Sequence, residues 1–425
     1  MANFLVTDRV KEMNNKLRLD ADKIIRESIE AVLPDEAVRK ALKSFTPGCG
    51  RTVLVAAGKA AWQMADAAVK ELGSVDEGIV ITKYGHVKGD IPGVVCCEAG
   101  HPVPDENSFE ATERAVNMVA GLGAEDRVIF LLSGGGSALF EMPLIPGKEL
   151  QYITQQLLAS GADIKEINTI RKRLSKVKGG RFAEVCAPAK VFSIVLSDVL
   201  GDPLDMIASG PAYPDSTTCE QALSIADKYK LSLSDRAKEL LKKETPKKID
   251  NVTTLITGSV RELCRAAGES CERLGYKVVY LTDQLDCEAS DAGRLLGSKV
   301  KSQSSSGKKL AFIAGGETVV HLKGHGKGGR NQELALAAAF EIEGLENVAV
   351  FSVGSDGTDG PTDAAGGYVD GETIAAIRNS GLDPEKMLKD NDSYNALKAA
   401  DGLIITGTTG TNVNDVSVGL CCFMS

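Results

Sequence analysis

Three aspartates stand close together in the stretch SVGSDGTDGPTDAAGG, residues 352–367, directly after the apolar run VAVF. Asp356, Asp359 and Asp363 are spaced three and four residues apart among glycines, threonines and one proline. Carboxylates this close repel one another unless a cation or a hydrogen-bond donor offsets their charge. The spacing does not fit an EF-hand loop, and hard oxygen ligands on a short turn suit Mg²⁺. We therefore predict that they bind Mg²⁺; the alternative is a structural turn held by aspartate hydrogen bonds.

Two basic residues occupy positions at predicted helix starts. Lys59 follows the strand-like run VLVAAG and is expected in the first turn of the next helix, although the sequence does not form a Walker A loop. Arg330 precedes NQELALAAA, a strong helical pattern for which Asn331 is the expected N-cap. A cation at a helix start opposes the helix macrodipole, whereas a bound anion there is favourable. Both residues are thus expected to bind a phosphate or carboxylate; the alternatives are a solvated lysine and a mobile basic loop.

The stretch KGHGKGGR, residues 323–330, is the densest in basic side chains and glycines in this acidic chain. Lys323, His325 and Lys327 stand there within eight residues, together with Arg330. Glycines without a Cβ allow a backbone to approach another group closely. We expect this loop to wrap closely round a ligand.

A run of three glycines follows the most apolar predicted strand, in LLSGGGSAL. Glycines allow backbone N–H groups to approach an oxyanion closely. The order of residues fits neither the GxGxxG dinucleotide fingerprint nor the GxSxG nucleophile elbow. The expected oxyanion cradle consists of Ser133, Gly134, Gly135, Gly136 and Ser137.

Polar side chains end several other predicted strands. Asp198 ends the strand in IVLSDV, where a carboxylate can bind Mg²⁺ or take a proton from a hydroxyl group. Asp202, in Gly-Asp-Pro, is expected to form a turn instead. His101 ends another strand, and a substrate contact and a structural role are equally compatible with it. Asn412 and Asp415, in TGTTGTNVND, are candidates to orient a ligand or a metal-bound water, and alone this stretch would be a turn.

The composition limits the class of protein. The chain has 425 residues, 43% of them hydrophobic, and a net charge of −9, which argues against nucleic acid as the main partner. An anionic substrate must then be met by local clusters of positive charge. No apolar run has the length of a membrane span, and the first residues lack a signal-peptide core. Ten cysteines without a CxxC pattern indicate reduced thiols, so we expect a cytoplasmic protein.

Short β-branched runs alternate with helical patterns along the chain. This alternation predicts an α/β fold of two domains with largely parallel, helix-flanked sheets in Rossmann-like layers. Right-handed crossovers place the carboxyl ends of parallel strands at one edge, where ligands bind. The polar segment 242–251 is expected to separate an N-terminal domain, residues 1–240, from a C-terminal domain, residues 250–425.

Seven of these stretches, taken in order, resemble the glycerate 2-kinases with a MOFRL-type C-terminal domain, whose members are often labelled hydroxypyruvate reductases. The resemblance covers essentially the whole chain, and ITGSVREL departs from it because the family tends to have asparagine where Val260 stands. The matching stretches are AAGKAA, AGHPVPDE, LLSGGGSAL, SDVLGDP with IASGP, GGETVV with GKGGRNQE, SVGSDGTDGPTDAAG and TGTTGTNVND.

The resemblance implies an enzyme that transfers phosphate from ATP to the 2-hydroxyl of D-glycerate, giving 2-phosphoglycerate and ADP, with Mg²⁺ required. It implies an active site in the cleft between two α/β domains, with Lys59, Asp198 and Arg330 as essential residues. On the stretches that match, the expected substrate or phosphate contacts also include His101, Gly316, Glu317, Thr318, Lys327, Asn331 and Asn412.

Two other classes of function are weighed against this one. An NAD(P)H-dependent hydroxypyruvate reductase would require a dinucleotide fingerprint that the sequence lacks. A non-catalytic protein that binds sugar acids or nucleotides would not need acidic positions beside the basic anion loops. The sequence leaves open which loop binds adenine, which other hydroxy acids are accepted and whether the protein is a homodimer.

Overall fold

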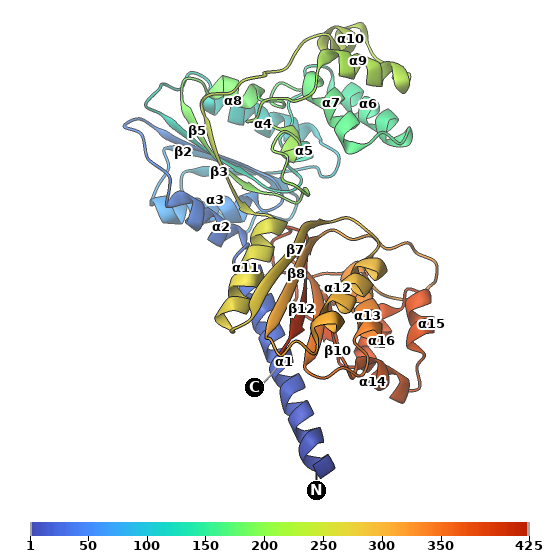
Figure 1. The fold of residues 1–425 in the computed structure, drawn as a ribbon. Helices are drawn as coiled ribbons and strands as arrows, with labels where there is room; N and C mark the ends of the chain where they lie inside the picture. The colour runs from blue at the N-terminus through green and yellow to red at the C-terminus, as the bar shows by residue number, and fades with distance from the viewer. Residues whose placement is uncertain (1, 423–425) are drawn as a thin grey trace. The chain divides into compact units, whose positions relative to one another are not determined.

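The structure is a computed structural model, which describes residues 2–422 and the side chains from residue 15 onward. The chain forms two compact units (Figure 1). The N-terminal unit comprises residues 34–257. The C-terminal unit comprises the residues up to 33 together with those from 258 onward.

The N-terminal unit is built on one sheet of six strands in the order β3-β2-β1-β4-β5-β6. The pairs β3–β2, β2–β1, β1–β4 and β4–β5 are parallel, as the sequence predicted. The strands are β1 (Thr52–Ala57), β2 (Glu77–Lys83), β3 (Val94–Ala99), β4 (Arg127–Leu132), β5 (Lys190–Leu196) and β6 (Val252–Gly258).

Helices cover both faces of this sheet, which explains its continuous apolar strands. Val53 and Val55 of β1 pack in one apolar cluster with α4 (Glu106–Val119) and α8 (Arg181–Cys186). Leu54, on the opposite face, packs with α2 and α3. These helices are α2 (Pro34–Leu42) and α3 (Ala61–Leu72).

The remaining helices of this unit form a smaller apolar cluster of their own. They are α6 (Gly147–Ala159), α7 (Ile164–Leu174), α9 (Cys219–Lys228) and α10 (Asp235–Leu241). Two short helices complete the unit: α5 (Gly136–Leu139) directly follows the glycine run, and the 3₁₀ helix η1 (Ile207–Ser209) follows the Asp198 segment.

The sheet of the C-terminal unit is mixed, with the order β11-β10-β9-β12-β8-β7. Only β7–β8 is parallel among its adjacent pairs in the described chain, so the prediction of a largely parallel sheet is wrong for this unit. The reasons are that β12 inserts antiparallel between β8 and β9, and that β10 pairs antiparallel with both β9 and β11. The strands are β7 (Lys277–Leu285), β8 (Leu310–Gly316), β9 (Val348–Gly354), β10 (Gly366–Asp370), β11 (Leu403–Ile404) and β12 (Asp415–Cys421).

The insertion of β12 brings distant residues to one edge of this sheet. Asp415, the first residue of β12, pairs in register with Gly316 at the end of β8 and with Gly354 at the end of β9. The GGET and SDGTDG stretches therefore begin beside the residue that ends TGTTGTNVND. The three segments therefore meet at one edge of the sheet, although β8 and β9 do not pair with each other.

Helices also cover both faces of the second sheet. One face packs in an apolar cluster with α12 (Ala289–Gln303), α13 (Arg330–Glu341), α14 (Thr373–Asn379) and α16 (Ser393–Ala399), with α15 (Pro384–Lys389) at its margin. The other face packs against α11 (Val260–Arg273) and the long first helix α1 (Ala2–Glu30) (Figure 1).

The two units divide the chain differently from the predicted ranges 1–240 and 250–425. Helix α1 packs in the C-terminal unit against α11 and β9, and its apolar side chains Leu17, Ile24 and Ile25 are buried. Strand β6, predicted to open the C-terminal domain, instead occupies the edge of the N-terminal sheet next to β5. The polar segment 242–251 is thus a connection within the N-terminal unit.

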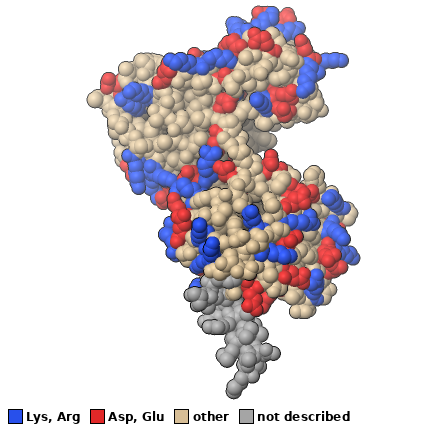
Figure 2. Space-filling view, viewed as in Figure 1, with Lys and Arg blue, Asp and Glu red and all other residues tan. Residues whose placement is uncertain are grey.

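The described helices all fall short of the combination of length and apolar character that a membrane crossing requires. Acidic and basic side chains are interspersed over the molecular face that Figure 2 shows, without a large area of one sign.

The contact between α1 and the rest of the C-terminal unit can be tested at a buried tyrosine. Tyr276 is 3% exposed and its hydroxyl donates to Asp20 Oδ2 of α1 at 2.7 Å. We expect Tyr276→Phe to lower the free energy of unfolding by about 1–3 kcal/mol, because it leaves a buried carboxylate oxygen without this donor. Tyr280→Phe is the control, since Tyr280 is 53% exposed. Calorimetry that shows equal losses for the two variants would contradict this assignment.

Candidate functional site

The glycine run and Lys59 lie side by side at the carboxyl edge of the N-terminal sheet. Lys59 N donates to Gly134 O at 2.9 Å, and the next amide, Ala60 N, donates to Ser133 Oγ at 3.0 Å. The sequence expectation that Lys59 lies in the first turn of a helix is wrong, since α3 begins at Ala61 and Ala60 is its N-cap. The main chain of Lys59 is instead fixed directly against the glycine run.

Three predicted site residues converge on these glycines. A Cβ built on Gly134 would lie 2.4 Å from Asp198 Oδ2, so a side chain at this position would force the carboxylate to shift. A Cβ on Gly135 would lie 2.9 Å from the His101 ring and 3.3 Å from Lys59 Cε. Three side chains that follow three different strands therefore surround one short backbone segment, as parallel topology requires.

The electrostatics of this cluster favour a neutral histidine. Burial lowers the pKa of His101, and the nearby Lys59 ammonium lowers it further. Lys59, His101 and Asp198 are all partly exposed. This edge combines a lysine, a neutral imidazole and a carboxylate beside the backbone of the glycine run. Such a set can bind a charged oxygen of a ligand and can accept or donate a proton.

A series of hydrogen bonds connects the end of the glycine run with two other segments. Ser137 Oγ lies 3.0 Å from Ser209 Oγ, which donates to Asn168 Oδ1 at 2.9 Å. Arg171 NH2 donates to Ser137 O at 2.8 Å. The sequence analysis missed these partners, because Asn168 and Arg171 lie in the helical pattern INTIRKRL, where basic residues are expected to face solvent. Asp202 has φ 51° and lies in a turn, as the sequence favoured.

In the C-terminal unit, Arg330 is already paired with two carboxylates. Its Nε and NH2 donate to the two oxygens of Asp415 at 2.6 and 3.0 Å, and its NH1 donates to Glu317 at 2.8 Å. The expectation that only a bound anion makes a cation favourable at this helix start is wrong, since the protein supplies the anions itself. The side chain of Asp415 is 7% exposed and that of Glu317 is 47% exposed.

Asp415 is the buried member of this edge. Burial raises the pKa of Asp415 to about 6, although the Arg330 guanidinium lowers it. A Cβ built on Gly354 would lie 3.3 Å from Asp356 Oδ1 and 3.4 Å from Asp415 Oδ1, so the two carboxylates meet above the same glycine. Asp356 is half-buried, and its Oδ1 accepts from Thr358 N at 2.9 Å. The structure thus places Asp356 near Asp415, a residue from outside its own turn.

Asp359, predicted as a metal ligand, lies instead at the start of α13. Its carboxylate accepts from the backbone amides of Asn331 and Gln332 at 3.1 and 2.8 Å and from Gln332 Nε2 at 2.9 Å. Burial raises the pKa of Asp359, and these donors oppose the rise. The prediction of Asn331 as the N-cap is wrong, because Gly329 is the N-cap and Asp359 satisfies the exposed amides from another segment. This geometry favours a structural role for Asp359.

The third aspartate of the opening stretch is exposed and lies among different neighbours. The Tyr394 hydroxyl lowers the pKa of Asp363, and Lys327 and Lys398 lower it further. Lys327 Nζ lies 3.9 Å from the centroid of the Tyr394 ring. Asp356, Asp359 and Asp363 therefore have three separate environments, and the structure does not assemble them into one ligand set.

The glycine-rich basic loop packs against its own unit. The amides of Lys323 and Gly324 donate to Asn391 Oδ1 at 2.8 and 3.0 Å, and Lys327 N donates to Asp392 Oδ1 at 3.0 Å. A Cβ on Gly326 would lie 2.4 Å from Asp392 Cβ. The glycines thus allow close packing on residues 390–393, whereas the sequence analysis expected them to wrap round a ligand. The Asp-Asn-Asp sequence at 390–392 is a turn signal that sequence reasoning did not connect with this loop.

The remaining predicted contacts lie at or near the same edge. Gly316 ends β8 with φ 153°, and a Cβ there would lie 2.2 Å from Leu285 O. Thr318 is buried and Asn412 is exposed, its Oδ1 accepting from Asn414 N at 3.4 Å. The loop before Asn412 contacts the aspartate turn, because Thr409 N donates to Asp356 O at 3.2 Å.

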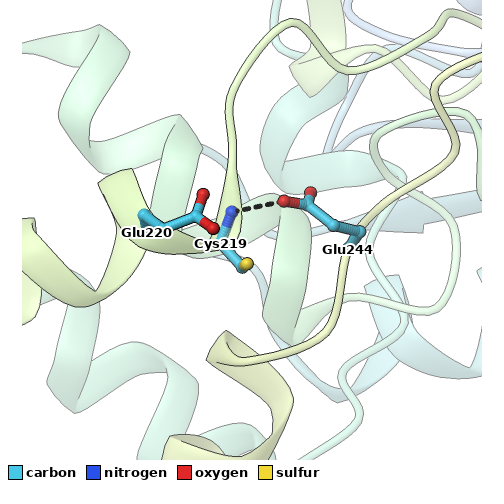
Figure 3. Close-up of side chains that lie close together, drawn as sticks. All are labelled: Cys219, Glu220 and Glu244. Atoms are coloured by element: carbon cyan, nitrogen blue, oxygen red, sulfur yellow. Dashed lines mark hydrogen bonds between the residues drawn. The ribbon is translucent and has the colours of Figure 1, made fainter.

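Another cluster of metal-ligand types lies in the N-terminal unit. Cys219, Glu220 and Glu244 have ligand atoms within 4.8 Å of one another, which no other set of three cysteine, histidine or acidic residues in the described chain achieves (Figure 3). Glu244 already accepts from Cys219 N at 2.8 Å and pairs with Lys247 at 3.0 Å. The Glu244 carboxylate raises the pKa of the Cys219 thiol, which keeps it protonated. This cluster is explained by its own hydrogen bonds.

Two family models match the chain. Residues 20–242 match a model described as a domain of unknown function, DUF4147, and residues 310–415 match the MOFRL family. The protein class is therefore that of two-domain α/β proteins that join these two domains, in agreement with the fold.

Relatives extend the match over nearly the whole chain. A D-glycerate 2-kinase of Thermotoga maritima is 53% identical over 94% of this chain and 97% of its own length. A glycerate 2-kinase of Pyrococcus horikoshii is 40% identical over 94% of this chain and 96% of its own. A crystal structure of glycerate kinase from Thermotoga maritima matches with a TM-score of 0.92 at 52% identity, over 96% of this chain and all of that one. The chain belongs to the glycerate 2-kinase family, as the sequence resemblance indicated.

The close approach at Gly135 can be tested with a matched glycine. Gly135 and Gly121 have nearly equal φ values, +87° and +84°, but a Cβ on Gly121 meets nothing within 4 Å. Either substitution by alanine should cost about 1–2 kcal/mol of stability through the left-handed backbone. Only Gly135→Ala should displace the His101 ring toward solvent and raise the pKa of His101 toward its ordinary value. NMR titration of His101 checks this, and an unchanged His101 pKa in Gly135→Ala would contradict the geometry.

Proposed function

We propose that the protein is an ATP-dependent kinase that phosphorylates the 2-hydroxyl of D-glycerate and releases 2-phosphoglycerate and ADP. The structural observation that carries this function is the convergence of Lys59, His101 and Asp198 on the glycine run. The naming of close relatives as glycerate 2-kinases supports the same reaction and substrate. Phosphoryl transfer requires positioning and positive charge more than covalent chemistry, and this edge supplies both.

In the N-terminal unit, each group has a distinct role in this proposal. Asp198 orients the attacking hydroxyl group and takes its proton, which requires a carboxylate within hydrogen-bond reach of the hydroxyl. The Lys59 ammonium and the amides of the glycine run stabilise the charged oxygens of the substrate. Neutral His101 is positioned to accept or donate a hydrogen bond without adding charge.

In the C-terminal unit, Arg330 is the proposed anion-binding group. An incoming carboxylate or phosphate must compete with the carboxylates that Arg330 already binds. Glu317 is the more exposed of these two and accepts only from NH1, so exchange at Glu317 needs less desolvation than exchange at Asp415. Asp415 then keeps the guanidinium plane fixed while its NH1 group binds the substrate. Combined action of both units on one substrate stays a prediction.

Mg²⁺ is the proposed metal, and Asp356 is the residue that would hold it. Asp356 stands half-buried at the edge beside the Asp415 carboxylate, whereas the oxygens of Asp359 already bond to the start of α13. Mg²⁺ usually binds one or two carboxylates together with substrate phosphates and waters, so Asp356 can serve as a ligand of the ion without an all-protein cage. The ion would neutralise charge on the phosphates of ATP.

The reductase reading lacks a structural basis at the glycine run. Two relatives from Agrobacterium vitis named putative hydroxypyruvate reductases are each 39% identical. The run lies after β4 and opens α5, a helix of only four residues, whereas the dinucleotide fingerprint opens a full helix after a strand. The geometry therefore favours the kinase.

A coupled assay tests the reaction. We expect glycerate-dependent release of ADP from ATP in the presence of Mg²⁺, and no oxidation of NADH with hydroxypyruvate. Phosphorus NMR of the product should show phosphate on the secondary carbon, because Asp198 is proposed to activate the 2-hydroxyl. NADH turnover without ADP release would refute the kinase, and a 3-phosphate product would refute the assigned hydroxyl.

The metal assignment is tested with a matched pair of aspartates. We expect Asp356→Asn to raise the Mg²⁺ concentration for half-maximal ADP release by at least about tenfold, since a metal ligand loses its charge. Asp363→Asn should leave the Mg²⁺ dependence unchanged, because Asp363 is exposed and hydrogen-bonded to Tyr394. An unchanged Mg²⁺ titration for Asp356→Asn would mean that its turn is structural.

A further inference from the structure

A fully buried lysine binds the segment that contains the glycine run. Lys178 is 0% exposed, and its ammonium donates to Phe140 O at 3.1 Å and to Ala208 O at 3.4 Å. Phe140 is the C-cap of α5, the short helix that the glycine run opens. Ala208 lies in η1, ten residues after Asp198. One side chain thus joins the segment of the glycine run to the segment that carries the proposed base.

A second buried cation binds the same short helix. Arg171 NH2 donates to Ser137 O at 2.8 Å and lies 3.5 Å from Glu141 Oε2. Lys178 Nζ lies 3.7 Å from the same carboxylate oxygen, and Glu141 is fully buried. The last carbonyls of a helix lack intrahelical donors, and cations are favourable at that end. Arg171 and Lys178 supply those donors, with Glu141 as their shared counter-charge.

The two joined segments have little freedom in their spacing. A Cβ on Gly134 would lie 2.4 Å from Asp198 Oδ2, and a Cβ on Gly136 would lie 2.8 Å from Ala208 Cβ. Ala208 and Ser209 both have positive φ values, 51° and 61°, which non-glycine residues adopt only when the surroundings impose them. A donor that bonds to the carbonyl of Ala208 is therefore placed where it can hold this conformation.

We propose that Lys178 is a positioning residue, which sets the distance between the Asp198 carboxylate and the glycine run by bonding to the carbonyls of Phe140 and Ala208. This inference rests on the proposed function for its catalytic consequence, and it adds a residue to that function which touches no substrate. The Lys178 ammonium donates to two carbonyls and forms an ion pair with the Glu141 carboxylate.

Burial disfavours the charged form of Lys178, and the Glu141 carboxylate offsets this cost. Burial lowers the pKa of Lys178 to about 8, while Glu141 raises it and Arg171 lowers it further. Two buried cations share one carboxylate, so removal of the amine does not leave Glu141 without a partner. A methionine at position 178 has a similar shape without donors and is the informative substitution.

The experiment compares Lys178→Met with Arg173→Met in the full chain. Arg173 is a buried cation of the same region, but its guanidinium binds Thr217, Asp215 and Glu244, which belong to neither segment. Two measurements are made on each variant. One is the kcat and KM for glycerate in the ADP-release assay, and the other is amide hydrogen exchange of residues 133–141 and 198–210.

For Lys178→Met we expect kcat to fall by about tenfold to hundredfold, as a misplaced reacting group produces, with KM for glycerate changed less than about threefold. Hydrogen exchange should become faster in both segments. Arg173→Met should lower the melting temperature but keep the wild-type kcat and the wild-type exchange in these segments. Ser209→Ala, which removes a neutral bond between the same segments, should change kcat in the same direction and less strongly; it replaces Lys178→Met if that variant does not fold.

Wild-type kcat and wild-type exchange in Lys178→Met, or in Ser209→Ala in its place, would overturn the inference. Equal effects of Lys178→Met and Arg173→Met on exchange in the two segments would also overturn it, because the role would then be one of general stability. If the wild-type protein releases no ADP with glycerate, the proposed function fails. The exchange comparison still decides the positioning role in that case, since it needs no catalysis.

Discussion

The contact between the Asp198 carboxylate and the backbone of Gly134 is the constraint on which the N-terminal unit depends. A Cβ on Gly134 would lie 2.4 Å from Asp198 Oδ2, so a side chain at position 134 would displace this carboxylate. Such close approach also requires that the segments behind it be fixed. Parallel strands β4 and β5 bring both segments to one edge, and the buried donors of Arg171 and Lys178 hold the short helix that follows. The glycine run, Asp198 and the two buried cations are thus connected by direct contacts and hydrogen bonds.

The C-terminal unit solves a different problem, which is to keep an arginine at a helix start without a ligand. The buried carboxylate of Asp415 binds two nitrogens of Arg330, and removal of Arg330 would leave this carboxylate buried without its counter-charge. Asp359 meanwhile satisfies the first amides of the same helix. The carboxylates of Asp415 and Asp359 come from different segments, and they neutralise Arg330 and the start of its helix. Both are already hydrogen-bonded to protein groups, so neither is left free for a metal. Only Asp356 of the opening stretch stands at this edge with Asp415.

The motifs and their placement at strand ends could be predicted from the sequence, because alternating apolar strands and helices place the following loops at one edge. Lys59, the glycine run and Asp198 were recognised in this way, and the structure brings them together. Partners that come from distant segments could not be predicted. Asp415 lies 85 residues from Arg330, and β12 reaches that position only because it inserts antiparallel between two strands. The glycines of the 323–330 loop were assigned to ligand binding because their packing partners at 390–393 form no periodic pattern. Helix α1 has an apolar face that several elements could cover, and only the fold selects α11 and β9.

The two cations that the sequence treated alike differ in what an anion must displace. Each guanidinium nitrogen of Arg330 donates to a carboxylate in the described structure, so an anion that replaces Glu317 gains only the difference between its own bonds and those of Glu317. Lys59 is partly exposed, its Cε would lie 3.3 Å from a Cβ on Gly135, and no ion pair of Lys59 is found among the described residues. An anion at Lys59 displaces water, whereas an anion at Arg330 displaces a protein carboxylate, which is the more selective exchange. Lys59 is accordingly suited to attract charged oxygens, and Arg330 is suited to accept only an anion whose shape and position match the NH1 group that Glu317 gives up.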